Sequence, residues 1–167
     1  MVVLSLASYV DRQGVPPSAM NNVSPKPSEI DRIRPSQGSA TILVVDDQPA
    51  LCEVAELLLT RCGYDVITAH DFLQAKMAVR QNPHIDLLLT DVEMPGMLGD
   101  ELAEWFWKTK PRAAVVFMSG NSLHRLRLRE HPFIEKPFVH LDVLLKTIRE
   151  ALARNRTTCQ SVAAIAA

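Results

Sequence analysis

The sequence predicts an α/β fold in which a doubly wound, five-stranded parallel sheet is covered by helices on both faces. Five short apolar runs, several rich in β-branched residues, alternate with stretches whose apolar side chains recur at helical spacing. The run Asp86–Asp91 holds three consecutive leucines, which is typical of a strand buried on both faces of a parallel sheet. With 167 residues, 47% of them hydrophobic, the chain can bury one core of ordinary size. Right-handed crossovers are expected between the strands.

The first half of the chain supplies three strands and two helices. The first helix is bounded by Pro49, which suits the first helical turn, and by Gly63, which is a stop signal. Asp71 is a favourable N-cap for the second helix, and Pro83 ends it. The expected strands of this half are 41–45, 64–69 and 86–91, and the expected helices are 49–62 and 71–81.

The second half supplies two more strands and three helices. Pro95 and Gly96 form a turn before the third helix, and Pro111 closes that helix. Only a dozen residues separate Gly120 from Phe133, which is enough for one short helix. The final helix carries a stripe of leucine and isoleucine along one face. The expected strands are 113–118 and 133–135, and the expected long helices are 98–108 and 141–153.

The ends of the chain differ from this pattern. Residues 1–40 are rich in proline, serine and asparagine, so we expect a flexible N-terminal extension. Residues 41–153 form the one folded domain, and residues 154–167, which are small and polar, are expected to form a flexible C-terminal tail.

Composition narrows the possible partners and compartment. The formal net charge of −1 makes nucleic acid an unlikely obligatory partner. Three cysteines without metal-binding or paired spacing indicate reduced thiols and a cytoplasmic location. We expect no signal peptide and no membrane span, because no apolar run approaches 18 residues.

Five polar side chains lie at or just past the carboxyl ends of four predicted strands. In parallel sheets these ends share one edge, where ligands bind. Clustered carboxylates stay ionised only beside a cation, and hard oxygen ligands with room for water suit Mg²⁺. A metal-bound aspartate can be a nucleophile toward a phosphoryl group, whose oxygens a lysine, a hydroxyl and the Gly120 amide could neutralise. The five residues are Asp46, Asp47, Asp91, Ser119 and Lys136.

These motifs resemble those of the receiver domains of bacterial two-component response regulators. The resemblance covers about residues 41–153 and implies a flavodoxin-like (βα)5 receiver fold. It is specific because five motif positions occur in order at successive strand ends. The matching segments are Ile42-Leu-Val-Val-Asp46-Asp47, Leu88-Leu-Thr-Asp91-Val-Glu-Met-Pro-Gly96, Met118-Ser119-Gly120 and Glu135-Lys136-Pro137-Phe138.

The resemblance also implies a role for each site residue. Asp91 is the expected phosphoacceptor, and Mg²⁺ is expected to bind Asp47 and Asp91 directly, Asp46 through water and the backbone carbonyl of Glu93. Ser119 is the expected switch hydroxyl and Lys136 the phosphate-binding cation, with a cis peptide expected between Lys136 and Pro137. Phe133 takes the position of the aromatic switch side chain. Ordinary turn, surface and core roles are the alternatives for Ser119, Lys136 and Phe133, respectively.

One departure from the family concerns the segment between Ser119 and Lys136. At 17 residues the interval is several residues shorter than is usual, which predicts a shortened fourth helix or a loop. That region ordinarily carries dimerisation or target binding. We therefore expect signal output to use another surface or a mobile loop.

The resulting hypothesis is a stand-alone response regulator receiver of a phosphorelay. A sensor histidine kinase or histidine phosphotransfer protein would phosphorylate Asp91, and the signal would pass by contact with an unknown downstream protein, with a homodimer possible. Its only catalysis would be its own phosphorylation and dephosphorylation. Two alternatives stay open: a Mg²⁺-dependent aspartyl-phosphate phosphohydrolase, with Glu93 as acid/base, and a receiver fold used as a phosphorylation-independent interaction module.

Overall fold

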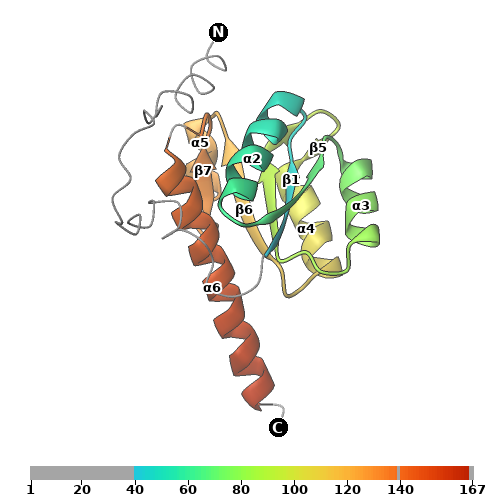
Figure 1. Ribbon diagram of the computed structural model, residues 1–167, viewed down its shortest axis with the longest axis vertical. Helices are drawn as coiled ribbons and strands as arrows, with labels where there is room; N and C mark the ends of the chain where they lie inside the picture. Colours follow the sequence, from blue (N-terminus) through green and yellow to red (C-terminus); the bar gives the residue numbers. More distant parts are fainter. Residues whose placement is uncertain (1–39, 139, 166–167) are drawn as a thin grey trace, which may run out of the picture.

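The centre of the molecule is a parallel sheet of five strands in the order β2-β1-β3-β6-β7 (Figure 1). The computed structural model describes residues 40–138 and 140–165. A separate antiparallel pair, β4 and β5, forms a small hairpin after β3. The strands of the sheet are β1 (Thr41–Val45), β2 (Asp65–Ala69), β3 (Leu87–Asp91), β6 (Ala114–Ser119) and β7 (Phe133–Glu135), and those of the hairpin are β4 (Glu93–Met94) and β5 (Met97–Leu98).

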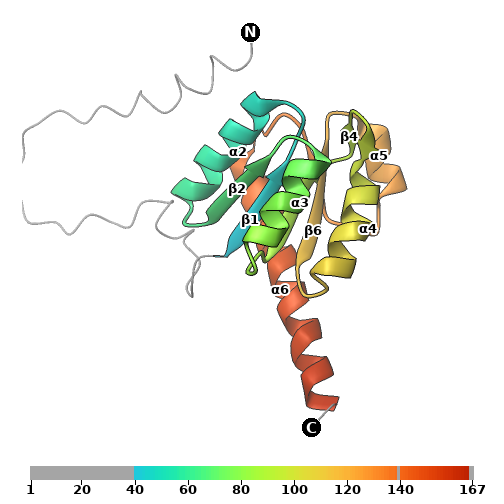
Figure 2. The same ribbon diagram turned by 90° about the vertical axis from the view of Figure 1, so that its right-hand side faces the viewer.

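Of the five helices in the described residues, four cover the sheet, α2 and α6 on one face and α3 and α4 on the other (Figures 1 and 2). Local sequence explains where they begin. Pro49 opens α2 in its first turn, and the Asp71 carboxylate caps α3 by accepting the backbone N–H of Gln74 at 2.7 Å. The helices are α2 (Pro49–Arg61), α3 (Phe72–Gln81), α4 (Gly99–Thr109), α5 (Ser122–Arg127) and α6 (Leu141–Ile165).

The core is divided into two halves by the sheet. Successive side chains of a strand point to opposite faces, so each strand contributes to both halves. In β1, Ile42 and Val44 pack with the helices α2 and α6, whereas Leu43 and Val45 pack with α3 and α4. All four are fully buried. This two-sided burial accounts for the nearly continuous apolar runs of the central strands.

The observed fold confirms the predicted class and all five strands, each within one residue of its expected bounds. The predicted end of the last helix was wrong. α6 continues to Ile165 instead of ending near residue 153, so the described part of the expected tail is helical. Residues 154–165 contain neither glycine nor proline, so no residue breaks the helix where the apolar stripe stops. The expected N-terminal extension lies outside the described residues, except Ala40, which is buried.

The short segment between β6 and β7 contains a helix of six residues, α5, which is one of the two outcomes that its length left open. The Asn121 side chain caps it by accepting the backbone N–H of Leu123 at 3.0 Å. Arg127 forms an ion pair of 3.1 Å with Asp100 of α4, and Leu128 is buried against the α4 side of the core. Arg127 and Leu128 therefore attach the carboxyl end of α5 to the domain. None of the helices in the described ranges has the length and apolar content to cross a membrane.

Candidate functional site

The polar residues that the sequence singled out gather at one edge of the sheet. Asp46 directly follows β1, Asp91 is the last residue of β3, Ser119 is the last residue of β6, and Lys136 directly follows β7. Because these strands are parallel, their carboxyl ends lie at the same edge. After β1 the chain adds β2 on one side and then crosses to β3 on the other, so Asp46 and Asp91 flank the point where the strand order reverses.

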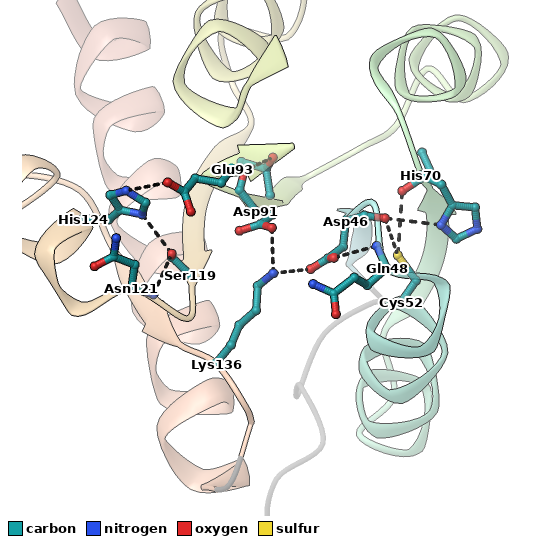
Figure 3. Close-up of polar contacts among 12 residues, drawn as sticks. Asp46, Gln48, Cys52, His70, Asp91, Glu93, Ser119, Asn121, His124 and Lys136 are labelled. Atoms are coloured by element: carbon teal, nitrogen blue, oxygen red, sulfur yellow. Dashed lines mark hydrogen bonds and ion pairs between the residues drawn. The ribbon is translucent and has the colours of Figure 1, made fainter. Parts of the chain in front are cut away.

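Lys136 connects the two buried acids (Figure 3). Its Nζ lies 2.7 Å from Oδ2 of Asp46 and 2.8 Å from Oδ2 of Asp91. The other carboxylate oxygen of Asp46 accepts the backbone N–H of Gln48 at 3.0 Å. Asp46 is fully buried and Asp91 is 5% exposed, so both depend on these partners in place of water.

Burial and ion pairing act in opposite directions on these groups. Burial raises the pKa of Asp46, and the hydrogen bond and charge of Lys136 offset this only in part. Burial by itself lowers the pKa of Lys136, but the hydrogen bonds to Asp46 and Asp91 outweigh it, so the pKa of Lys136 is raised. The lysine is therefore held as an ammonium ion, and one cation is not enough to offset the burial of Asp46.

The acids offer a site that fits a divalent cation. One carboxylate oxygen each from Asp46, Asp47 and Asp91 lies within 4.8 Å of the other two. Three carboxylates and the Lys136 ammonium leave a formal charge of −2 at the site. Asp47 is partly exposed, so water can reach this side of the cluster. An all-oxygen donor set with access to water is the environment that Mg²⁺ prefers.

Ser119 takes part in a second set of contacts that leads away from the acids. Its hydroxyl oxygen accepts the backbone N–H of Asn121 at 3.0 Å and lies 2.9 Å from Nδ1 of His124. Nε2 of the same histidine lies 3.3 Å from Oε1 of Glu93. No role was predicted for His124, because a histidine five residues past a strand has no recognisable signature in the sequence.

The backbone around Asp91 is also closely supported. The Thr90 hydroxyl donates to the carbonyl oxygen of Asp91 at 3.0 Å. α4 begins with Gly99, and a Cβ at this position would lie 2.0 Å from the same carbonyl oxygen. Glycine therefore allows α4 to start directly against the end of β3. This requirement was not predicted, since it depends on how closely two segments approach.

The contacts of the other two candidate residues, Glu93 and Phe133, are with groups outside the acid cluster. The Glu93 side chain is 63% exposed and contacts His124, while its expected metal contact is through the backbone carbonyl. Phe133 is half-buried and packs against the α3 and α4 half of the core. The peptide bond between Lys136 and Pro137 is cis, as expected. Two unpredicted neighbours, Cys52 and His70, contact the backbone carbonyl of Asp46.

Comparison with known proteins agrees with this geometry. The family model for the response regulator receiver domain matches residues 42–149, so the chain belongs to this family of two-component signalling domains. Receiver domains bind Mg²⁺ at an acidic pocket and generally act as signalling modules that are not enzymes. They are phosphorylated by histidine kinases or phosphotransfer proteins.

The individual relatives are mainly larger proteins. The chain is 32% identical over 112 residues to the response regulator GtcR of Aneurinibacillus migulanus, covering 65% of this chain and 46% of the relative. It is 34% identical over 120 residues to the transcriptional regulatory protein ZraR of Klebsiella oxytoca, covering 69% of this chain and 27% of the relative. The chain thus spans about half or less of the length of these two curated relatives.

Solved structures show the same fold. A response regulator receiver domain protein from Clostridium thermocellum matches with a TM-score of 0.63 at 27% identity, covering 71% of this chain and 98% of that one. The response regulator TrrA from Thermotoga maritima, solved in complex with Mg²⁺ and beryllofluoride, matches with a TM-score of 0.60 at 30% identity. That match covers 67% of this chain and 98% of TrrA.

Proposed function

We propose that Asp91 is the phosphoacceptor of this receiver domain and that Asp46, Asp47 and Asp91, with the Glu93 backbone carbonyl, hold Mg²⁺. The observation that carries the proposal is the Lys136 ammonium, which lies within 2.8 Å of both Asp46 and Asp91 at the carboxyl edge of the sheet. A surface lysine or an isolated acid pair would not place a cation between two buried carboxylates. The complex of TrrA with Mg²⁺ and beryllofluoride shows that a member of the same fold binds these ions together.

The chemistry follows from the charges of the site. An Asp91 carboxylate oxygen forms the new bond to phosphorus, while the bond from phosphorus to a nitrogen of the donor histidine breaks and the electron pair stays on that nitrogen. Lys136 stabilises charge on the phosphoryl oxygens, and Asp46 keeps this lysine charged and oriented. When bound, Mg²⁺ supplies further positive charge to the transferred group. Hydrolysis by water returns Asp91 to the free carboxylate.

Stoichiometric labelling separates this proposal from its alternatives. Purified protein with excess Mg²⁺ and acetyl phosphate should take up at most one phosphoryl group per chain, and Asp91→Asn should abolish the uptake. The exposed Asp142→Asn variant is the matched control and should label normally. Turnover of a small phosphomonoester would favour a phosphohydrolase, and a wild-type chain that takes up no phosphoryl group would overturn the proposal.

We propose that a sensor histidine kinase or a phosphotransfer protein donates the phosphoryl group in the cytoplasm and that output passes by protein–protein contact. The buried cysteines Cys52 and Cys62 are free thiols, which suits a reducing compartment. We also predict that the receiver is a stand-alone protein. The size of the native protein in cell extracts would test this prediction. Output that depends on the Asp91 phosphate should be lost in Asp91→Asn. Partner binding that persists in that variant would favour the phosphorylation-independent module.

A further inference from the structure

His124 bridges two parts of the site that come from different elements. It lies in α5 and is 15% exposed, with Nδ1 toward the Ser119 hydroxyl at the end of β6 and Nε2 toward the Glu93 carboxylate in β4 (Figure 3). Figure 3 also shows the Asp91 carboxylate facing Lys136, while the Ser119 hydroxyl contacts His124. One imidazole ring therefore holds the hydroxyl that the phosphoryl group would need.

The direction of these hydrogen bonds depends on where the imidazole ring carries its proton. An ionised Glu93 can only accept, so Nε2 of His124 carries the proton that lies between them. In the neutral imidazole Nδ1 is then an acceptor, and the Ser119 hydroxyl donates its proton to it. The backbone N–H of Asn121 donates to the oxygen of the same hydroxyl. With the neutral imidazole, the Ser119 hydroxyl thus donates its single proton to Nδ1 of His124.

We propose that His124 is a positioning residue that holds Ser119 in the unphosphorylated arrangement and competes with the phosphoryl group for its hydroxyl proton. This inference rests on the proposed function and on the role expected for Ser119 from the sequence, in which its hydroxyl donates to a phosphoryl oxygen. A serine hydroxyl has one proton, so the bond to a phosphoryl oxygen forms only when the bond to Nδ1 is broken. Phosphorylation of Asp91 therefore releases the contact that ties His124, and with it α5, to the end of β6.

Because α5 is short, the loss of the hydrogen bond between Ser119 and His124 removes one of the described contacts that hold this helix in place. The helix has six residues, and its other described side-chain contacts include that of His124 with the exposed Glu93, the exposed ion pair from Arg127 to Asp100 and the packing of the buried Leu128 that follows it. Exposed ion pairs contribute little to stability. The hydrogen bond between Ser119 and His124 is thus a principal link between the phosphoacceptor site and the amino-terminal half of α5, where Leu123 is 68% exposed.

Two substitutions of His124 separate its two contacts. His124→Asn keeps a polar atom at the position of Nδ1, which can hold Ser119 but does not reach Glu93. His124→Gln places its polar atoms near the position of Nε2, which can reach Glu93 but leaves Ser119 free. His124→Ala removes both contacts. Each variant is first compared with wild type by urea unfolding, and the Asn and Gln variants, which keep a polar side chain, are interpreted even where the alanine variant does not fold.

The readout is the affinity for beryllofluoride, which mimics a phosphoryl group, measured by ¹⁹F NMR titration with excess Mg²⁺. His124→Gln and His124→Ala should bind it about fivefold more tightly than wild type, because a typical net hydrogen bond corresponds to a factor of this size. His124→Asn should bind as wild type does. If His124 had a purely structural role, each variant would bind beryllofluoride more weakly, in proportion to its loss of stability. The Gln variant would then not bind it more tightly than the Asn variant.

The outcomes distinguish this inference from the proposed function. Wild-type affinity in all three variants, weaker binding in all three, or equal tightening in the Asn and Gln variants would overturn the positioning role while leaving Asp91 as phosphoacceptor. A wild-type protein that binds no beryllofluoride would overturn both. In the supporting case, the amide signal of Asn121 should also shift when beryllofluoride binds to wild type, since its partner oxygen changes position.

Discussion

Removal of the Lys136 ammonium is the most direct test of how the site is held together. In Lys136→Met the side chain keeps most of its volume and loses its charge, so Asp46 and Asp91 lose the cation at 2.7 and 2.8 Å. The lysine side chain is only 8% exposed, so water cannot simply replace the ammonium. Removing one partner of a buried ion pair costs about 3–5 kcal/mol of unfolding free energy.

The expected loss lies near the lower end of this range, about 3 kcal/mol. Burial already raises the pKa of Asp46, so this carboxyl group can take up a proton when the lysine is gone. The assay is urea unfolding at neutral pH, once with a chelator and once with excess Mg²⁺. The loss should be smaller with Mg²⁺, because a divalent cation bound by the folded state neutralises the same acids.

The controls address folding and general charge effects. Lys146→Met removes an exposed lysine from α6 and should change the unfolding free energy by less than about 0.5 kcal/mol. In the double variant Asp46→Asn/Lys136→Met the loss should be smaller than the sum of the single losses, because the partners are removed together. A Lys136→Met protein within about 1 kcal/mol of wild type in chelator would refute the reasoning.

Three further predictions concern the surroundings of the site. Gly99→Ala should lower the unfolding free energy by about 1–3 kcal/mol, because its Cβ would overlap a backbone carbonyl. Gly120→Ala should change stability little, because an added Cβ there has no neighbour within 4 Å. Equal losses in urea unfolding would contradict this. Asp71→Ala should cost about 1 kcal/mol through loss of the α3 cap, and an unchanged urea midpoint would argue against the cap. Burial raises the pKa of Cys52 to about 11. In a variant that keeps Cys52 as its sole cysteine, the thiol should therefore react with a thiol reagent at pH 8 only after unfolding. Rapid reaction of the folded protein would contradict the burial of Cys52.

The sign of the Cys52 effect also sets a pH dependence. A thiol whose pKa is raised on folding stabilises the folded state below the pKa of the unfolded thiol, which is 9.0 for the isolated group. This contribution is lost as the pH rises from about 9 to about 11, because the unfolded chain ionises first. Stability at pH 8 that exceeds stability at pH 10.5 by more in wild type than in a Cys52→Ala variant would confirm the shift.

The fold and the acidic site were predictable because both depend on short-range patterns and one rule of topology. Runs such as Leu87–Asp91 identify strands, and the carboxyl ends of parallel strands must meet at one edge. Asp46, Asp91 and Lys136 could therefore be brought together before any coordinate was known. The rule gives proximity only, and the distances of 2.7 and 2.8 Å needed the structure.

The contacts that were missed depend on side-chain direction or on close approach of the backbone. His124 reaches Ser119 because α5 is short and starts directly after the strand, and the sequence does not determine where its imidazole points. Gly99 is required by its distance to one carbonyl oxygen, which has no pattern of its own. The end of α6 was missed for another reason: the small and polar residues after 153 predict a frayed tail, although residues 154–165 contain no glycine or proline to end the helix.

The length of α6 carries its carboxyl end far from the phosphoacceptor site. The helix starts five residues after Lys136 and has 25 residues, which corresponds to about 37 Å at 1.5 Å per residue. Its base packs on the sheet through Leu144, Leu145 and Ile148, and the far end extends past the sheet (Figures 1 and 2). A tilt of about 5° at the base would carry the tip through about 3 Å over that length. A small change in the direction of α6 at its base would therefore displace its far end by a larger distance.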